Sequence, residues 1–219
     1  MPDKLFNIPE KKQQLLDEIV SRLSDIDDMA AIVLGGSYAS GTQRETSDLD
    51  IGLYYLESQP FSIEDIRCIA QEISIGGNPT VTRFYEWGAW VNGGAWIHTD
   101  QGKIDFLYRN IDQVQRTIDE SRKGIVHHDY DQQPTNGFYS VIYLAETQIC
   151  KPLYDPGMRI ASLKKQVEIY PSRLKQKIIT DSLWGAEFTL LHARGFATQG
   201  DSWIFRNSFA TSILFIVNS

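Results

Sequence analysis

The chain has 219 residues, of which 42% are hydrophobic and 22% are charged, and its 28 acidic residues outnumber the 21 basic ones. This length allows a buried core in one large or two small domains. A net charge of −7, without any basic stretch, argues against binding to duplex nucleic acid, which requires a positive surface.

The sequence also bears on the cellular compartment. The N-terminal stretch MPDKLFNIPEKKQQ is polar and lacks the apolar core of a signal peptide, and no apolar run approaches the length of a membrane span. Cys68 and Cys150 lie far apart in apolar settings and match no metal-ligand pattern, so we expect two free core thiols. These features predict a cytoplasmic protein that does not contact membranes.

The first elements are a helix and a short strand. Leu15, Ile19 and Leu23 recur at helical intervals, which predicts an amphipathic helix within residues 9–28. The apolar run at 30–34 then suits a buried strand. A helix is expected to start at Ser37, directly after this strand and the Gly-Gly turn that ends it.

The turn Gly35-Gly36-Ser37 is the first candidate for a binding site. Glycines allow backbone amides to approach a ligand closely, and amides at a strand-to-helix turn favour an anion such as a nucleotide phosphate. A lone Gly-Gly-Ser sequence is more often only a turn. The prediction of a phosphate site therefore depends on the acidic residues of the next strand.

Two aspartates occur after this turn in a period-two pattern. Asp48 and Asp50 alternate with Leu49 and Ile51, so in a strand both carboxylates point to one face. Like charges placed side by side repel, and a divalent cation with a preference for oxygen ligands, such as magnesium, relieves the repulsion. An Asp-x-Asp pattern alone is usually a solvated strand edge, but its place after the Gly-Gly-Ser turn favours a metal site.

The next segments are predicted to be a helix and an antiparallel sheet. Ser62 and the acids after it start a helix at 62–75. Two or three antiparallel strands are expected within 81–109, with a hairpin turn at 100–102. The last of them carries Asp105 between Ile104 and Phe106, where a carboxylate is costly unless it is paired or bound to metal.

Aromatic side chains are frequent in this region. Trp87, Trp90 and Trp96 could stack on a base or on an antibiotic ring, although packing within a sheet is the more common role of such residues. His127 and His128 lie in a polar connection whose spacing matches no standard metal site, and we interpret it as a loop.

The remaining chain is predicted to be helical, at 111–121, 137–150, 158–170 and 171–194, with Pro152 and Pro156 marking the joint before the third of these helices. The apolar segment 208–219 stops without a capping glycine or a charged last turn. Its exposed apolar face would need a partner, and a homodimer is one solution.

The combination of strand, Gly-Gly-Ser turn and Asp-x-Asp strand resembles the nucleotidyltransferase superfamily that includes DNA polymerase beta. Within it, the chain resembles more closely the small bacterial antibiotic nucleotidyltransferases that act on aminoglycosides or lincosamides. Gly36 and Ser37 match the Gly-Ser of the family, Asp48 and Asp50 match its two metal-binding carboxylates, and Asp105 is the candidate for the third. The resemblance implies an α+β fold, with a nucleotidyltransferase domain at 1–110 (a mixed sheet flanked by helices) and a helical bundle domain at 111–219.

The resemblance also implies a mechanism. Asp48, Asp50 and Asp105 would hold two Mg²⁺ ions that align a nucleoside triphosphate, with ATP as the expected donor. One ion would activate a hydroxyl of the acceptor and the other would neutralise the departing pyrophosphate. The terminal phosphates would contact Gly36 and Ser37, with Arg44 or Arg109 as further candidates.

The expected product is a small-molecule acceptor, for example an antibiotic, that carries AMP on a hydroxyl group. The acidic composition is compatible with a cationic acceptor such as an aminoglycoside. Two other classes remain open: the transferase of a toxin–antitoxin pair, which would modify a partner protein, and a non-catalytic nucleotide-binding scaffold. Glu146 is a weak candidate for the general base, which we leave unassigned.

Overall fold

The structure is a computed structural model that describes residues 8–132 and 137–200, together with positions 204, 206, 207, 210, 211 and 213. The predicted apolar segment 208–219 therefore lies largely outside the described residues. The chain divides into two compact units, which are described separately. The first comprises Met1–Asp119 and His127–Ile169, and the second comprises Glu120–Val126 and Tyr170–Ser219.

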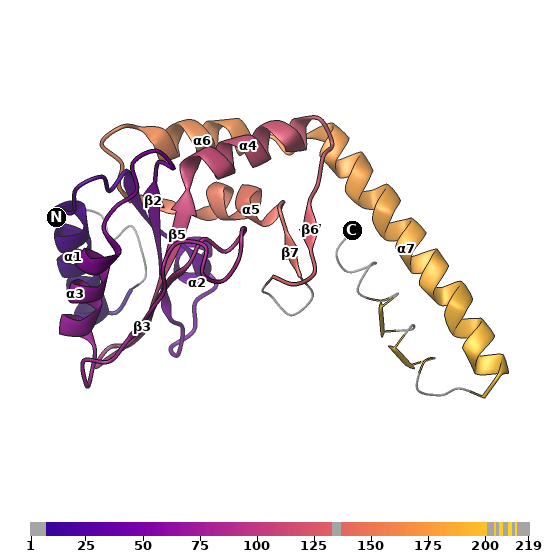
Figure 1. Cartoon of the computed structure of the whole chain (residues 1–219), viewed down its shortest axis with the longest axis horizontal. Coiled ribbons are helices and arrows are strands. Elements are labelled where there is room, and N and C mark those ends of the chain that lie inside the picture. Colours follow the sequence, from indigo (N-terminus) through magenta and orange to yellow (C-terminus); the bar gives the residue numbers. More distant parts are fainter. Residues whose placement is uncertain are drawn as a thin grey trace. The chain divides into compact units, whose positions relative to one another are not determined.

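The centre of the first unit is a six-stranded mixed sheet (Figure 1). Its strands are β1 (Ala31–Leu34), β2 (Leu49–Tyr55), β3 (Thr80–Val81), β4 (Gly94–Thr99), β5 (Gly102–Asn110) and β8 (Lys151–Tyr154). They lie in the order β3-β4-β5-β2-β1-β8, with β2 and β5 parallel and every other pair antiparallel. The sheet and its flanking helices confirm the predicted α+β class.

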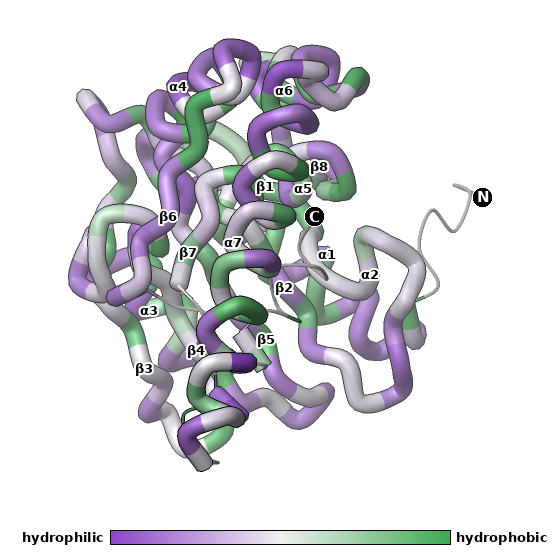
Figure 2. Tube along the Cα trace, turned by 90° about the vertical axis from the view of Figure 1, so that its right-hand side faces the viewer, coloured by the Kyte–Doolittle hydropathy of each residue, from purple (hydrophilic) through white to green (hydrophobic). Residues whose placement is uncertain are grey.

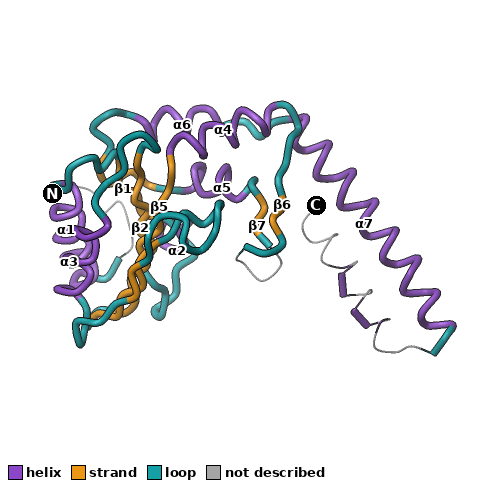
Figure 3. The backbone as a smooth tube through the Cα atoms, in the orientation of Figure 1, coloured by secondary structure: helices purple, strands orange, loops and turns teal. Residues whose placement is uncertain are grey.

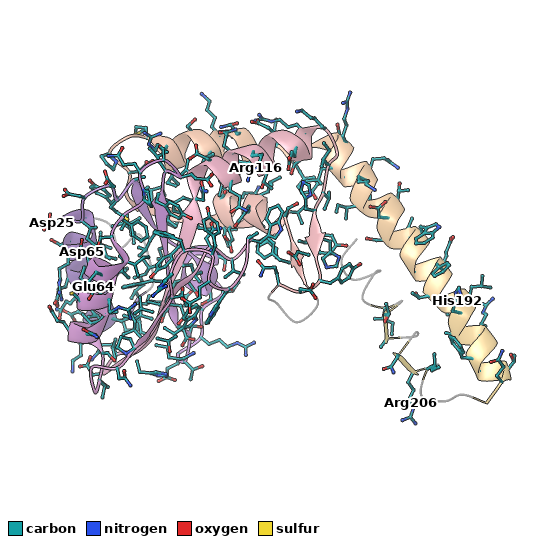
Figure 4. The ribbon with its side chains drawn as sticks, in the orientation of Figure 1. Asp25, Glu64, Asp65, Arg116, His192 and Arg206 are labelled. Atoms are coloured by element: carbon teal, nitrogen blue, oxygen red, sulfur yellow. The ribbon has the colours of Figure 1, made fainter. Side chains whose placement is uncertain are left out.

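Two helices, α1 (Glu10–Ser24) and α3 (Ile63–Ile73), cover one face of this sheet (Figure 3). Their apolar residues form the main core with alternate positions of β2 and β5, including Leu49, Ile51 and Phe106. The predicted start of α3 is confirmed, because the Ser62 side chain accepts a hydrogen bond from the backbone of Asp65. The acids Asp25, Glu64 and Asp65 lie on this side of the unit (Figure 4).

The opposite face of the sheet carries the intervening residues of the same strands. Asp50 alternates with the core residues of β2, and Asp105 alternates with those of β5. The short helix α2 (Gly36–Ser40) and the helix α5 (Ile142–Ile149) lie toward this face (Figure 1). The candidate carboxylates are therefore on the side of the sheet that α1 and α3 leave uncovered.

The predicted hairpin before Asp105 is confirmed, because β4 and β5 pair up to Thr99 and Gly102 with the turn between them. The sequence does not predict the strand β8. Pro152 is interpreted there as a joint, but it lies opposite Val33 in an edge strand, where a missing backbone donor is tolerated. A two-stranded hairpin, β6 (His128–Asp129) and β7 (Phe138–Tyr139), likewise replaces the expected loop and the expected start of a helix.

This division of the chain differs from the predicted domain boundary at residue 110. The segment His127–Ile169 belongs to the first unit because it supplies β8, α5 and α6 (Arg159–Val167). The helix α4 (Ile111–Arg122) follows β5 and precedes these elements in the chain. Both hydrophilic and hydrophobic residues occur along α4 and α6 (Figure 2). Residues 127–169 therefore complete the first unit, to which they supply the edge strand β8.

The second unit contains the long helix α7 (Ser172–Thr198). It exposes several large apolar side chains, namely Leu183, Trp184, Phe188 and Leu191.

Of the two cysteines, Cys150 is buried as predicted, whereas Cys68 is exposed because it lies on the outer side of α3. Among the described residues, no helix combines the length and the apolarity needed to cross a bilayer.

Candidate active site

The strand register brings Asp50 and Asp105 together. The two residues are direct neighbours across the parallel pair β2 and β5, and neighbouring strands lie about 4.8 Å apart. Trp96 of β4 is the antiparallel partner of Asp105, so it projects from the same face. One row across three strands therefore presents two carboxylates and an indole ring.

The Asp50 carboxylate is strongly perturbed. Its pKa rises from the usual 3.8 to about 6, chiefly because of burial and in addition because of the nearby carboxylates of Asp105 and Asp48. Glu146 acts in the same direction, and Arg109 opposes it. A bound cation would relieve this excess of negative charge.

The Gly-Gly-Ser turn lies directly against Asp50. The backbone N–H of Gly35 donates to the carbonyl oxygen of Asp50 at 2.8 Å, which fastens the turn to β2. Gly36 has a φ of +55°, and a Cβ atom at this position would overlap the Oδ2 atom of Asp50. The positive φ and the contact with Asp50 both require glycine at position 36. Because glycine has no side chain, the backbone of the turn can lie directly against the Asp50 carboxylate.

Asp48 lies just before β2 and forms an ion pair. The Lys103 Nζ atom is 3.5 Å from Asp48 Oδ2, and the two side chains are partly exposed. Among the described residues, no three histidine, cysteine or acidic side chains converge closely enough to hold a metal ion. The structure thus shows two carboxylates side by side and a third that is held by a lysine.

The surroundings of the Asp105 carboxylate test whether these residues fit a metal ion. Its Oδ1 atom is buried and, within the described part of the chain, has no hydrogen-bond partner. Burial raises the pKa of Asp105, while Lys103 lowers it and Asp48 raises it. A buried carboxylate oxygen without a partner is costly, and oxygen atoms of this kind are the ligands that Mg²⁺ prefers. The oxygen atoms of Asp50 and Asp105 therefore fit a magnesium site.

Arg109, a candidate for phosphate binding from the sequence, has another role. It is buried, and it donates to both carboxylate oxygens of Glu146, from Nε at 2.7 Å and from Nη2 at 2.8 Å. Its Nη1 atom donates to the Tyr108 carbonyl at 2.9 Å. The guanidinium therefore connects β5 to α5. Through this pair, Glu146 lies close enough to Asp50 to raise its pKa.

The remaining candidates lie around the turn. Ser37 is in the first turn of α2 and is partly exposed to solvent, and Arg44 lies in the connection from α2 to β2. The end of this connection is held by Lys12, which is buried and donates to the Ser47 carbonyl at 3.0 Å. Sequence reasoning missed Lys12. Its spacing of four residues from Leu16 on the apolar face of α1 was the signal that could have revealed it.

Comparison with known families agrees with this arrangement. Residues 15–91 match the family described as nucleotidyltransferase domain, a range that includes the Gly-Gly-Ser turn, Asp48 and Asp50. Residues 15–91 are therefore similar to a nucleotidyltransferase domain of the DNA polymerase beta-like type. The family implies a transferase enzyme, and the match identifies neither a donor nor an acceptor. Asp105 and Glu146 lie outside the matched range, and no curated protein matches the chain.

Proposed function

We propose that the protein is a magnesium-dependent nucleotidyltransferase that moves AMP from ATP to a hydroxyl group of a small-molecule acceptor and releases pyrophosphate. One observation carries this proposal: Asp50 and Asp105 lie side by side on the face against which the Gly36 turn packs. The matched nucleotidyltransferase domain supports the reaction type.

The carboxylates would act together as metal ligands. Asp50 lies between the turn and Asp105, and these two carboxylates would together hold the Mg²⁺ ions. Asp48 would complete the set after separating from Lys103. When bound, Mg²⁺ lowers the pKa of a substrate hydroxyl and neutralises charge on a leaving pyrophosphate.

The turn would hold the phosphates that leave. Because the Gly36 backbone already contacts the Asp50 carboxylate, phosphate oxygens on the same metal ions would lie beside the backbone amides of the turn. Ser37 adds a hydroxyl donor next to this position, and Arg44 supplies a positive charge on the connection from α2 to β2. Arg109 is assigned no phosphate contact because Glu146 occupies its guanidinium.

The acceptor side of the site favours a cation. Asp48 and Asp105 place negative charge near the reacting position, and Lys103 balances only part of it, whereas the charge of Glu146 is paired with Arg109. Such a field attracts amine-bearing molecules and repels anionic ones. An aminoglycoside-like antibiotic fits this chemistry and is the acceptor class that we propose to test first.

Ligand-dependent unfolding tests the function. Wild type and Asp50→Asn are heated with each of the four nucleoside triphosphates, with and without Mg²⁺, because a ligand that binds only the folded state raises the midpoint. We expect a magnesium-dependent rise with ATP that the variant loses. Release of pyrophosphate in the presence of candidate acceptors then identifies the substrate. No rise with any nucleotide would contradict the proposal and favour a non-catalytic scaffold.

A further inference from the structure

Two tryptophans form a stacked pair beside the carboxylates. The rings of Trp87 and Trp96 have centroids 4.1 Å apart and planes inclined by 21°. Trp96 belongs to β4, and Trp87 lies in the loop between β3 and β4. Trp87 is 39% exposed, so the pair is not enclosed in the core.

The strand register fixes the position of this pair relative to the site. Trp96 is the cross-strand partner of Asp105, which is in turn the neighbour of Asp50. Two strand spacings, about 10 Å, thus separate the backbone of Asp50 from that of Trp96. The Gly36 turn contacts Asp50 from the β1 side, so the indoles and the turn lie at opposite ends of one row.

The loop that carries Trp87 is firmly attached to the first unit. The Gln132 side chain donates to the Trp87 carbonyl and accepts from the Trp90 backbone N–H at 2.8 Å. Asn92, at the end of the loop, is buried and donates to Gln113 at 2.8 Å. These bonds hold the backbone on both sides of Trp87. An exposed indole on a fixed loop is a preformed stacking surface, because little ordering remains to be done when a ring binds.

We propose that the Trp87 and Trp96 pair is the platform on which the base of the nucleoside triphosphate stacks. The inference rests on the proposed function and adds a site for the base to it. The terminal phosphates would lie at the Gly36 turn and the α-phosphate at Asp50 and Asp105. The ribose would continue along the row, so that the base covers the exposed Trp87 ring. The two strand spacings of about 10 Å that separate Asp50 from Trp96 leave room for a nucleoside monophosphate between the α-phosphate and the base.

This assignment also predicts which nucleotides bind. Every base has a π-face, so an aromatic platform tolerates all four and favours those with the larger ring system. We therefore expect purine nucleotides to bind more tightly than pyrimidine nucleotides. The preference among them should weaken when Trp87 is replaced by an aliphatic residue.

The experiment compares two probes by isothermal titration calorimetry in the presence of Mg²⁺: ATP, and inorganic tripolyphosphate, which lacks the base and the ribose. The variants are Trp87→Leu, which keeps an apolar side chain without a π-face, and Trp87→Phe, which keeps a ring. Trp184→Ala, which removes an exposed indole from α7 in the second unit, is the control. Thermal unfolding of each variant shows that it is folded.

For Trp87→Leu we expect ATP binding to weaken about 5- to 100-fold, which is the usual worth of one base-aromatic stack. Tripolyphosphate binding should stay within about twofold of wild type, Trp87→Phe should retain most of the ATP affinity, and the control should match wild type. Quenching of tryptophan fluorescence by ATP should fall in Trp87→Phe, because one of the two stacked indoles is then missing.

Unchanged ATP affinity in Trp87→Leu would overturn the platform, and the indoles would then belong to the acceptor or to packing alone. Equal weakening of both probes would also overturn it, since the loss would lie in the phosphate site. If neither probe binds the wild-type protein with Mg²⁺, the proposed function itself fails. These results separate a failure of the platform from a failure of the enzyme assignment.

Discussion

The replacement Asp50→Asn should stabilise the metal-free protein while removing its activity. The folded state raises the pKa of Asp50 from 3.8 to about 6, mainly because burial disfavours the charged form. Between these two values the folded carboxyl keeps a proton that the unfolded chain has lost. The free energy of unfolding therefore falls as the pH rises from about 4 to about 6, and the penalty is complete above that range.

The size of this effect is set by the pKa shift. A rise of about two units corresponds to at most about 3 kcal/mol, and screening by solvent at this partly exposed group reduces the expected value to about 1–2 kcal/mol. Asparagine keeps the shape of the side chain without its charge. We therefore expect Asp50→Asn to be more stable than wild type by about 1–2 kcal/mol at pH 8, and by almost nothing at pH 4.

Urea unfolding with EDTA, at pH 4 and at pH 8, measures this difference through the shift of the midpoint at constant slope. Asp27→Asn is the matched control because Asp27 is an exposed acid, and it should show no pH-dependent difference from wild type. Added Mg²⁺ should stabilise wild type and leave Asp50→Asn unchanged. A variant that is less stable than wild type at pH 8, or equally stabilised at both pH values, would refute the electrostatic reasoning.

Three further predictions concern the surroundings of Asp50. Gly36→Ala should abolish metal binding because its Cβ displaces the Asp50 carboxylate, whereas Gly41→Ala, at a similar positive φ with open space around it, should cost about 1 kcal/mol of stability and leave metal binding intact. Calorimetric titration with Mg²⁺ distinguishes the two. Lys103→Met should raise the Mg²⁺ affinity of the nucleotide-free protein by up to about fivefold, because a competing cation leaves the site; weaker binding would contradict this role. Glu146→Ala should destabilise the protein by about 3 kcal/mol in urea unfolding, because it leaves the buried Arg109 charge unpaired, and stability equal to wild type would show that the pair is dispensable.

The parts of the site that the sequence predicts are those with a local signal. The Gly-Gly-Ser turn and the alternation around Asp50 depend only on neighbouring residues, and the structure shows the short helix and the strand where they are expected. Asp105 is placed on a strand by the same alternation. Its position beside Asp50 depends on the register of two strands that are far apart in sequence, which no local pattern encodes.

Long-range contacts account for the features that sequence reasoning missed. Lys103 resembles any surface lysine until the register brings it to Asp48, and Arg109 resembles a free phosphate ligand until α5 brings Glu146 to it. The strand β8 is short and contains Pro152, so its sequence lacks both the length and the alternation of a typical strand. Only pairing with β1 defines it.

These contacts determine how much of the chain the candidate site requires. The matched domain ends at residue 91, before β4 and β5, and therefore lacks Asp105. The predicted boundary at 110 would include Asp105 but leave Arg109 without Glu146, and it would expose the edge of β1 that β8 covers. A buried arginine without its carboxylate and an uncovered strand edge are both unfavourable. The smallest part of this protein that satisfies the groups around Asp50 is thus the first compact unit, in which residues 127–169 complete a site that residues 1–119 begin.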